Sequence, residues 1–420
     1  MKLLRDTIAR NRAGDGVALT SVCSAHPLVL AASLRLAEAL DQPLLVEATS
    51  NQVNQFGGYT GMRPADFVAW VGDLADQHGV SRDRLYFGGD HLGPQVWRKQ
   101  PAEQAMAHAR DLMREFVTAG FTKIHLDCSE GCAGEAAQVG DTLSAARAAD
   151  LAAVCEAVAP DPAALSYCFG TEVPPPGGAR ADDNHDSVTP TDPAAAAATI
   201  TAHHQAFVER GLSAAWPRMV ALVVQPGLEF TPDHVIRFDM GQPDLLSPVL
   251  PEGMAFEAHS TDYQADAVYP DLARRHFAVL KVGPALTFAM RRGLYALDAL
   301  AAWQGRKCRL PEVMEQLMCA DPAVWAAHYP EGEGLRDLLH FGYADRIRYY
   351  WNLPQAQAAV AGLLAALDGP RPPAPLLDQF FAPATIARAA GISGVSWAEA
   401  LVLAEVQAVL LPYFACQKGL

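Results

Sequence analysis

The feature that most constrains the fold of this chain is a set of eight short apolar runs, rich in β-forming residues, within the first 290 residues. Nearly every run ends in a polar or ionisable residue, and segments with helical periodicity lie between the runs. Eight parallel strands that alternate with helices close into a barrel whose chemistry collects at the carboxyl ends of the strands. The sequence therefore predicts an α/β fold, a (β/α)8 TIM barrel, with strands within residues 18–26, 44–51, 85–93, 123–130, 165–172, 219–227, 255–263 and 278–286.

The chain has 420 residues and is longer than one such barrel, which typically takes about 250. We expect the barrel to occupy residues 1–304 and to end with a helix over 285–304. Residues 305–420 lose the alternation and hold apolar helical stretches such as 398–414. They predict a mainly helical C-terminal extension packed on the barrel, either under its bottom or in an oligomer interface.

The charge balance limits the partners of this chain. Lys and Arg number 32 against 47 Asp and Glu, a net charge of −15, and no basic run occurs, which argues against a nucleic-acid or membrane surface. A pocket can still be locally positive, so a small anionic substrate fits. The eight cysteines show no CxxC spacing, and the N-terminus lacks the apolar core of a signal peptide. We expect a cytoplasmic protein.

The sharpest local signal is GGDHLGP at residues 88–94, which ends the third strand with Asp90 and His91. An Asp beside a metal-bound His is suited to acid/base catalysis while the imidazole holds the ion. Neighbouring strand residues point in opposite directions, so the strand end must bend to bring both to the mouth. The alternative is an Asp and a His that satisfy amides of their own loop.

Three further strand ends complete a set of candidate metal ligands. His259 ends the seventh strand, and the carboxylates of Asp127 and Glu172 end the fourth and fifth. Together with His91 they offer the nitrogen and oxygen ligands that Zn²⁺ prefers, with Mn²⁺ or Ni²⁺ as alternatives. His125 alternates with Asp127 and shares its orientation if the strand is regular. Structural hydrogen bonding is the competing interpretation of these residues.

The segment after the second strand suits a polyhydroxylated ligand. Glu47 is a second candidate for moving a proton, and Asn51 and Gln52 offer amides that both donate and accept hydrogen bonds to sugar hydroxyls. Gln225, at the end of the sixth strand, is a further candidate for substrate binding. A loop that caps itself with Asn and Gln is the alternative.

Lys281 on the eighth strand precedes a helix whose first amides resemble the usual phosphate site of such barrels, with Ser260 and Thr261 nearby. We expect these three residues to contact a substrate phosphate or carboxylate. A Schiff base between Lys281 and a ketose, or a salt bridge from Lys281 to Glu47 or Glu257, is the alternative.

Nine motifs, spread in order over residues 5–351, resemble the tagatose-1,6-bisphosphate aldolase subunit family of the KbaZ/GatZ type, once labelled tagatose-6-phosphate kinase. They are SVCSAHPLV, VEATSNQVNQFGGYTGM, GGDHLGP, KIHLDCSEGCAGE, GTEVPPPGG, VVQPGLEF, EAHSTDYQ, LKVGPALTFA and DRIRYYW. Beyond residue 352 little of the resemblance is left. The kinase label finds no support, because the chain lacks a GxxxxGK[ST] loop.

The resemblance implies a barrel protein of galactitol and N-acetylgalactosamine catabolism that assists a class II aldolase, its catalytic partner subunit. It also implies a second option, a stand-alone metal-dependent 4-epimerase that interconverts fructose and tagatose by retro-aldol chemistry. A sugar-phosphate binding protein without turnover is the third. We therefore expect a homo-oligomer that binds a ketose or ketose phosphate and a divalent metal.

Overall fold

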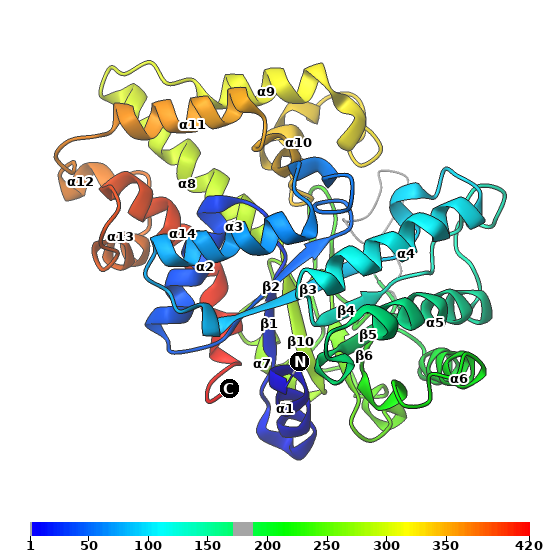
Figure 1. Ribbon diagram of the computed structural model, residues 1–420. Helices are drawn as coiled ribbons and strands as arrows, with labels where there is room; N and C mark the ends of the chain where they lie inside the picture. The colour runs from blue at the N-terminus through cyan, green and yellow to red at the C-terminus, as the bar shows by residue number, and fades with distance from the viewer. Residues whose placement is uncertain (1, 171–187) are drawn as a thin grey trace.

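The computed structural model describes residues 2–170 and 188–420, and its centre is a closed barrel of eight parallel strands (Figure 1). Each of the eight predicted runs overlaps one of these strands, so the predicted TIM barrel is confirmed. Around the barrel the order is β1-β10-β9-β6-β5-β4-β3-β2. The strands are β1 (Leu19–Val22), β2 (Leu44–Thr49), β3 (Leu85–Leu92), β4 (Lys123–Leu126), β5 (Ser166–Gly170), β6 (Met219–Val223), β9 (Ala255–Ala258) and β10 (Phe277–Val282).

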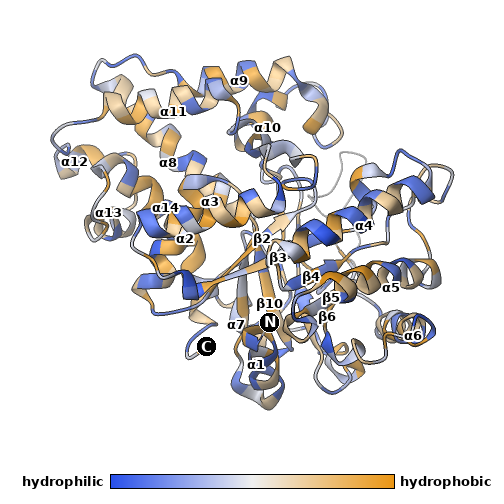
Figure 2. Ribbon diagram, viewed as in Figure 1, coloured by the Kyte–Doolittle hydropathy of each residue, from blue (hydrophilic) through white to orange (hydrophobic). Residues whose placement is uncertain are grey.

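An outer layer of helices covers the barrel. Four of these helices have Pro in their first turn, where its missing N–H costs no hydrogen bond. In Figure 2 the strand ribbons are largely hydrophobic, whereas α4 alternates hydrophobic and hydrophilic residues, as a helix with one solvent face does. The layer consists of α2 (Pro27–Ala39), α3 (Pro64–Gln77), α4 (Ala102–Thr118), α5 (Asp141–Val158), α6 (Pro193–Glu209), α7 (Val268–Arg274) and α8 (Pro284–Trp303).

One connection departs from the predicted strand–helix alternation. Between β6 and β9 the chain forms a small antiparallel pair, β7 (Glu229–Phe230) with β8 (Val235–Ile236), and then a short 3₁₀ turn at Ser247–Val249. Four prolines between residues 232 and 251 interrupt the backbone hydrogen bonds that a helix needs. The expectation of a helix after every strand is therefore wrong at this connection.

The amino end of the barrel is closed by α1 (Lys2–Arg10). Its Leu4 and Ile8 are buried against floor residues that include Leu19, Leu45 and Val279. The last residues of the chain share this end, because Leu420 packs on the same floor residues and the Gly419 carbonyl oxygen accepts a hydrogen bond from Arg10. Helices α9, α10 and α11 of the C-terminal region lie toward the opposite end, at the mouth (Figure 1). The region comprises α9 (Leu310–Ala320), α10 (Leu335–Phe341), a 3₁₀ turn at Arg346–Tyr350, α11 (Pro354–Ala366), α12 (Ala374–Leu377), α13 (Pro383–Ala390) and α14 (Trp397–Ala415).

The last helix, α14, belongs to the barrel wall. It packs against α2 and α8, and the Cys416 carbonyl that follows it accepts a hydrogen bond from the Ala18 amide just before β1. Among the described helices α14 alone is long and apolar enough to cross a membrane by length and composition, and most of it is buried inside the molecule. Its apolar sequence is therefore explained by core packing on two neighbouring helices.

Candidate functional site

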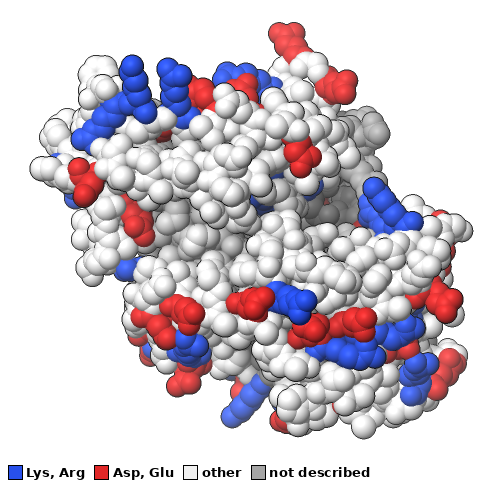
Figure 3. All heavy atoms as spheres, turned by 45° about the horizontal axis from the view of Figure 1, so that its top comes forward, with Lys and Arg blue, Asp and Glu red and all other residues white. Residues whose placement is uncertain are grey.

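A cavity of about 140 Å³ opens at the carboxyl ends of the barrel strands. Figure 3, in which the top of Figure 1 is turned forward, shows a hollow at the centre of this face and charged side chains of both signs around it. Seven of the predicted site residues line the cavity, namely Asn51, Gln52, Asp90, His91, His259, Ser260 and Lys281. Side chains more than 200 positions apart in the sequence thus meet at one mouth.

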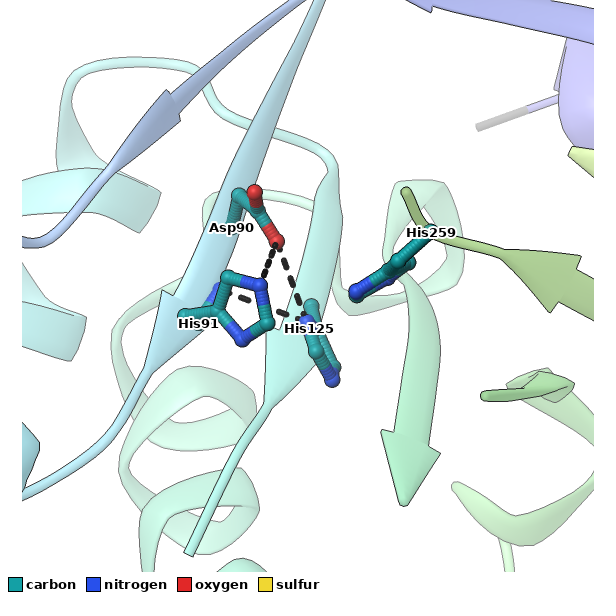
Figure 4. Close-up of side chains that lie close together, drawn as sticks. All are labelled: Asp90, His91, His125 and His259. Carbon is teal, nitrogen blue, oxygen red and sulfur yellow. Dashed lines mark hydrogen bonds and ion pairs between the residues drawn. The ribbon is translucent and has the colours of Figure 1, made fainter. Parts of the chain in front are cut away.

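Three imidazoles and one carboxylate form the centre of this mouth (Figure 4). One ligand atom each from Asp90, His91, His125 and His259 lies within 4.8 Å of the others. The His91 and His259 rings are 4.9 Å apart between centroids, and the His91 and His125 rings are 4.8 Å apart. His125 is the member that the sequence suggested only weakly, through its alternation with Asp127.

A local irregularity in β3 brings the neighbours Asp90 and His91 to the same space. The pairing of β3 with β4 shifts register between Gly89 and Leu92, and His91 has a left-handed backbone with φ of 45°. The following Gly93 has no room for a side chain, since a Cβ atom there would lie 1.8 Å from the Asp127 carbonyl oxygen. The expected bend of the strand end is therefore present, with a physical cause.

Two carboxylates orient two of the imidazoles. Asp127 lies 2.7 Å from His91 Nδ1, and Glu257 lies 2.9 Å from His259 Nε2. An N–H donated to a carboxylate leaves the other ring nitrogen with its lone pair, the arrangement of outer carboxylates in carboxylate–histidine–metal triads. Asp127 therefore acts on His91 in this arrangement, and the cluster of candidate ligand atoms does not include it.

His125 carries a contact that a cation would explain. Its Nδ1 accepts the His91 amide N–H at 3.2 Å, and its Nε2 lies 3.0 Å from the Gly170 carbonyl oxygen. The Asp90 carboxylate oxygen lies 3.1 Å from the same Nδ1. This contact is favourable when a proton or a metal ion lies between the two atoms.

Directly below the mouth lies a buried network of charges. Lys123 Nζ is 2.5 Å from Glu47 and 2.8 Å from Glu257, as charge contacts whose angles do not meet hydrogen-bond geometry. Lys281 bonds to Asp90 and lies 3.1 Å from Glu257 and 3.4 Å from Glu47. Glu47 is thus fully buried one layer below the expected position, because β2 continues to Thr49 and Thr49 lines the mouth.

The network sets the protonation of its upper members. Burial raises the pKa of Asp90, but His91 and Lys281 outweigh burial and hold this pKa well below its ordinary value. Burial lowers the pKa of Lys281, yet Asp90, Glu257 and Glu47 raise it well above its ordinary value. The amine of Lys281 is therefore protonated and engaged by carboxylates, which disfavours both a Schiff base and a phosphate contact.

The buried charges fit a divalent cation. Four buried carboxylates, Asp90, Asp127, Glu47 and Glu257, face two buried ammonium groups, Lys123 and Lys281. This network has two more carboxylates than ammonium groups, an excess of negative charge that is costly away from water unless protons on the neighbouring imidazoles or a bound cation balance it. One divalent ion among Asp90 and the three imidazoles would balance this excess, so the residues present suit such an ion.

Two of the predicted substrate-binding residues lie outside the cavity. The hydroxyl of Thr261 donates to the Lys281 carbonyl oxygen at 2.5 Å and is fully buried, because the left-handed Ser260 turns the chain away from the cavity. Gln225 lines a separate cavity, and its side chain accepts the amide N–H groups of Gly227 and Leu228. Glu172 lies outside the described residues.

The helix end that was expected to bind phosphate already holds a carboxylate. Asp262 accepts the amide N–H groups of Gly283 at 3.1 Å and Ala285 at 2.8 Å, at the start of α8. Burial raises the pKa of Asp262 to about 6, although these amides oppose the shift. A phosphate at this helix end would therefore have to displace a capping carboxylate of the same charge.

Comparisons with known proteins agree on one family. Residues 4–418 match the model of a family described as D-tagatose-1,6-bisphosphate aldolase subunit GatZ/KbaZ-like. A protein of Agrobacterium fabrum (strain C58) named D-tagatose 6-phosphate 4-epimerase is 47% identical over 425 residues, covering 98% of each chain. A crystal structure from Sinorhizobium meliloti 1021, labelled a tagatose 6 phosphate kinase, superposes with a TM-score of 0.86 at 45% identity, over 95% of this chain and 100% of that one.

Proposed function

Since the chain belongs to the GatZ/KbaZ-like family of D-tagatose-1,6-bisphosphate aldolase subunits, we propose that it is a divalent-metal-dependent 4-epimerase of a ketose 6-phosphate that works by retro-aldol cleavage. One observation carries the proposal, namely an ionised Asp90 beside three imidazoles at the cavity, in a buried network that has four carboxylates and two ammonium groups. The relative named D-tagatose 6-phosphate 4-epimerase supports the choice of reaction.

In this mechanism Asp90 moves the proton. Its carboxylate accepts the proton of the C4 hydroxyl while the C3–C4 bond breaks, which leaves an aldehyde at C4 and an enediolate on C1 to C3. The aldehyde turns and presents its opposite face, the C3–C4 bond reforms, and Asp90 returns the proton to the C4 oxygen. Lys281 is a positioning residue, because its ammonium group keeps Asp90 ionised and in place.

His91, His125 and His259 are the residues that would hold the ion, and Zn²⁺ suits three imidazoles, with Mn²⁺ or Ni²⁺ as alternatives. A bound divalent ion supplies Lewis-acid stabilisation of negative charge on the sugar oxygens. Asn51 and Gln52 line the same cavity and would bind sugar hydroxyls.

A second candidate function is supported by the family description, which names an aldolase subunit. In that role the chain assists a catalytic class II aldolase subunit in the cleavage of tagatose 1,6-bisphosphate. Cleavage and epimerisation share the same first step, so the mouth residues suit both. The kinase label of the solved relative is not carried over, because the sequence has no GxxxxGK[ST] loop.

The test is an assay of the purified chain alone, freed of metal and reloaded with Zn²⁺, Mn²⁺ or Ni²⁺. We expect D-tagatose 6-phosphate and D-fructose 6-phosphate to interconvert. Asp90→Asn should lower kcat by about 10²- to 10⁴-fold, whereas the exposed control Asp83→Asn should match the parent chain. If no interconversion occurs and bisphosphate cleavage requires an added class II aldolase chain, the subunit function is correct. Ligand binding without turnover in either assay would indicate a binding protein.

Compartment and assembly stay predictions. All eight cysteines are free thiols, and most of them are buried, which suits the reducing cytoplasm that we propose. The homo-oligomer and the aldolase partner are proposals that size-exclusion chromatography with light scattering would test directly.

A further inference from the structure

The C-terminal region contributes a cation to the mouth of the barrel. Arg348 lies in the 3₁₀ turn at Arg346–Tyr350 and lines the same cavity as His91 and Lys281. The neighbouring Tyr349 packs edge-on against Tyr59 of the loop after β2, with ring centroids 5.0 Å apart. The turn is therefore docked on the barrel where Arg348 enters the cavity.

Among the residues that the structure describes, none forms a salt bridge with Arg348. Its Nη1 donates to the carbonyl oxygens of Ala344 at 2.5 Å and Asp345 at 3.1 Å, and its Nη2 donates to the Tyr349 hydroxyl at 2.9 Å. Within residues 2–170 and 188–420 no carboxylate lies within 4.0 Å of its guanidinium as an ion-pair partner. These bonds fix the group in one orientation beside the cavity, where its charge acts on Asp262 and Asp345 without a salt bridge to either. A guanidinium held in this way suits an anionic ligand.

The other groups that were expected to bind phosphate are engaged. Lys281 is held by Asp90, Glu257 and Glu47. The first amides of α8 are capped by Asp262, which also lines the cavity, and the Thr261 hydroxyl faces the backbone. Arg348 is thus the cationic group of this mouth, among the described residues, that has no carboxylate partner.

We propose that Arg348 binds the phosphate of the phosphorylated ketose and thereby determines the preference for phosphorylated over free sugars. This inference rests on the proposed function. In a ketose 6-phosphate the phosphate stays on the aldehyde fragment after C3–C4 cleavage, so Arg348 would also retain that fragment while the aldehyde turns. A planar guanidinium suits this role because two of its N–H groups can bond two phosphate oxygens at once.

A binding experiment tests the inference without any turnover. Inorganic phosphate is titrated into the full-length, metal-loaded protein by isothermal calorimetry, with chloride at equal ionic strength as the reference. Loss of charged hydrogen bonds in Arg348→Gln should weaken phosphate binding by about 10- to 100-fold. Arg348→Lys keeps the positive charge but loses the paired N–H donors of the guanidinium, so its phosphate affinity should lie between those of the parent and Arg348→Gln. Arg336→Gln, an exposed charge on α10, is the matched control and should bind as the parent does.

Turnover then gives the second measurement. The ratio of kcat/KM for D-tagatose 6-phosphate to that for D-tagatose should fall about 10- to 100-fold in Arg348→Gln, and release of glyceraldehyde 3-phosphate per epimerisation should rise. If the parent turns over neither sugar, the proposed function fails while the phosphate titration still decides the role of Arg348. Equal phosphate affinity in parent and Arg348→Gln, or no phosphate binding by the parent, overturns the inference. Should Arg348→Gln unfold, the parent and Arg348→Lys decide it by the same two measurements.

Discussion

Replacing Lys123 by Met should destabilise the barrel strongly, although Lys123 does not line the mouth. The side chain is fully buried between Glu47 and Glu257. Removing one partner of a buried ion pair typically costs about 3–5 kcal/mol, because the remaining charge is left without compensation. For 420 residues an unfolding entropy of about 2.1 cal/mol/K per residue gives about 0.9 kcal/mol/K, so the melting temperature should fall by about 3–6 °C.

The same substitution should change how stability depends on pH. Burial raises the pKa of Glu257, but Lys123 and Lys281 outweigh burial and hold this pKa well below its ordinary value. Without Lys123 the folded-state pKa of Glu257 rises, so at low pH a proton can neutralise the buried carboxylate that has lost its partner. A group with a raised folded-state pKa loses its stabilising contribution as the pH rises through that value. The deficit of Lys123→Met should therefore be smaller at pH 5 than at pH 8.

Urea unfolding followed by circular dichroism at pH 5, 7 and 8 measures both effects. The double variant Lys123→Met with Glu47→Gln removes one charge of each sign and should recover part of the lost free energy of unfolding. The exposed control Lys99→Met should stay within about 0.5 kcal/mol of the parent. The reasoning is refuted if Lys123→Met is as stable as the parent at every pH, or if Glu47→Gln makes it less stable still.

Three further outcomes are expected. Asp127→Asn should weaken metal binding about 10- to 100-fold, because the carboxylate that orients His91 is lost. Competition with a chromophoric chelator measures the metal affinity, and an unchanged affinity would show that Asp127 has no role in metal binding. Asp262→Asn should raise the free energy of unfolding at pH 8 by up to about 3 kcal/mol relative to the parent, but not at pH 4. The reason is that the folded-state pKa of about 6, against an ordinary 3.8, makes the ionised carboxylate unfavourable in the folded protein as the pH rises. The same difference between variant and parent at both pH values would contradict this. Removal of metal with a chelator should lower the melting temperature, and Zn²⁺ at 100 times its Kd should restore about 2.7 kcal/mol; identical melting with and without metal would count against the centre.

The local pattern of the sequence was sufficient to predict the barrel and some of the residues at its mouth. Apolar runs of strand length separated by helical periodicity predict eight parallel strands. Chain order then places the strand ends at one rim, which brought Asp90, His91 and His259 together across about 170 residues. The resemblance of ordered motifs identified the family that the comparison with known proteins confirmed.

Only the tertiary structure decided how deep Glu47 lies in the barrel, where β3 bends, and which distant side chains come into contact. Alternation along β2 predicts which way Glu47 points, but only the extent of the strand sets its layer below the mouth. The register shift in β3 depends on its pairing with β4, and so does the arrival of His125 beside His91. The position of Arg348 depends on how a C-terminal turn docks on a loop almost 300 residues earlier. These are contacts between distant segments, whose geometry follows from packing of the whole chain and leaves no periodic signal in any one segment.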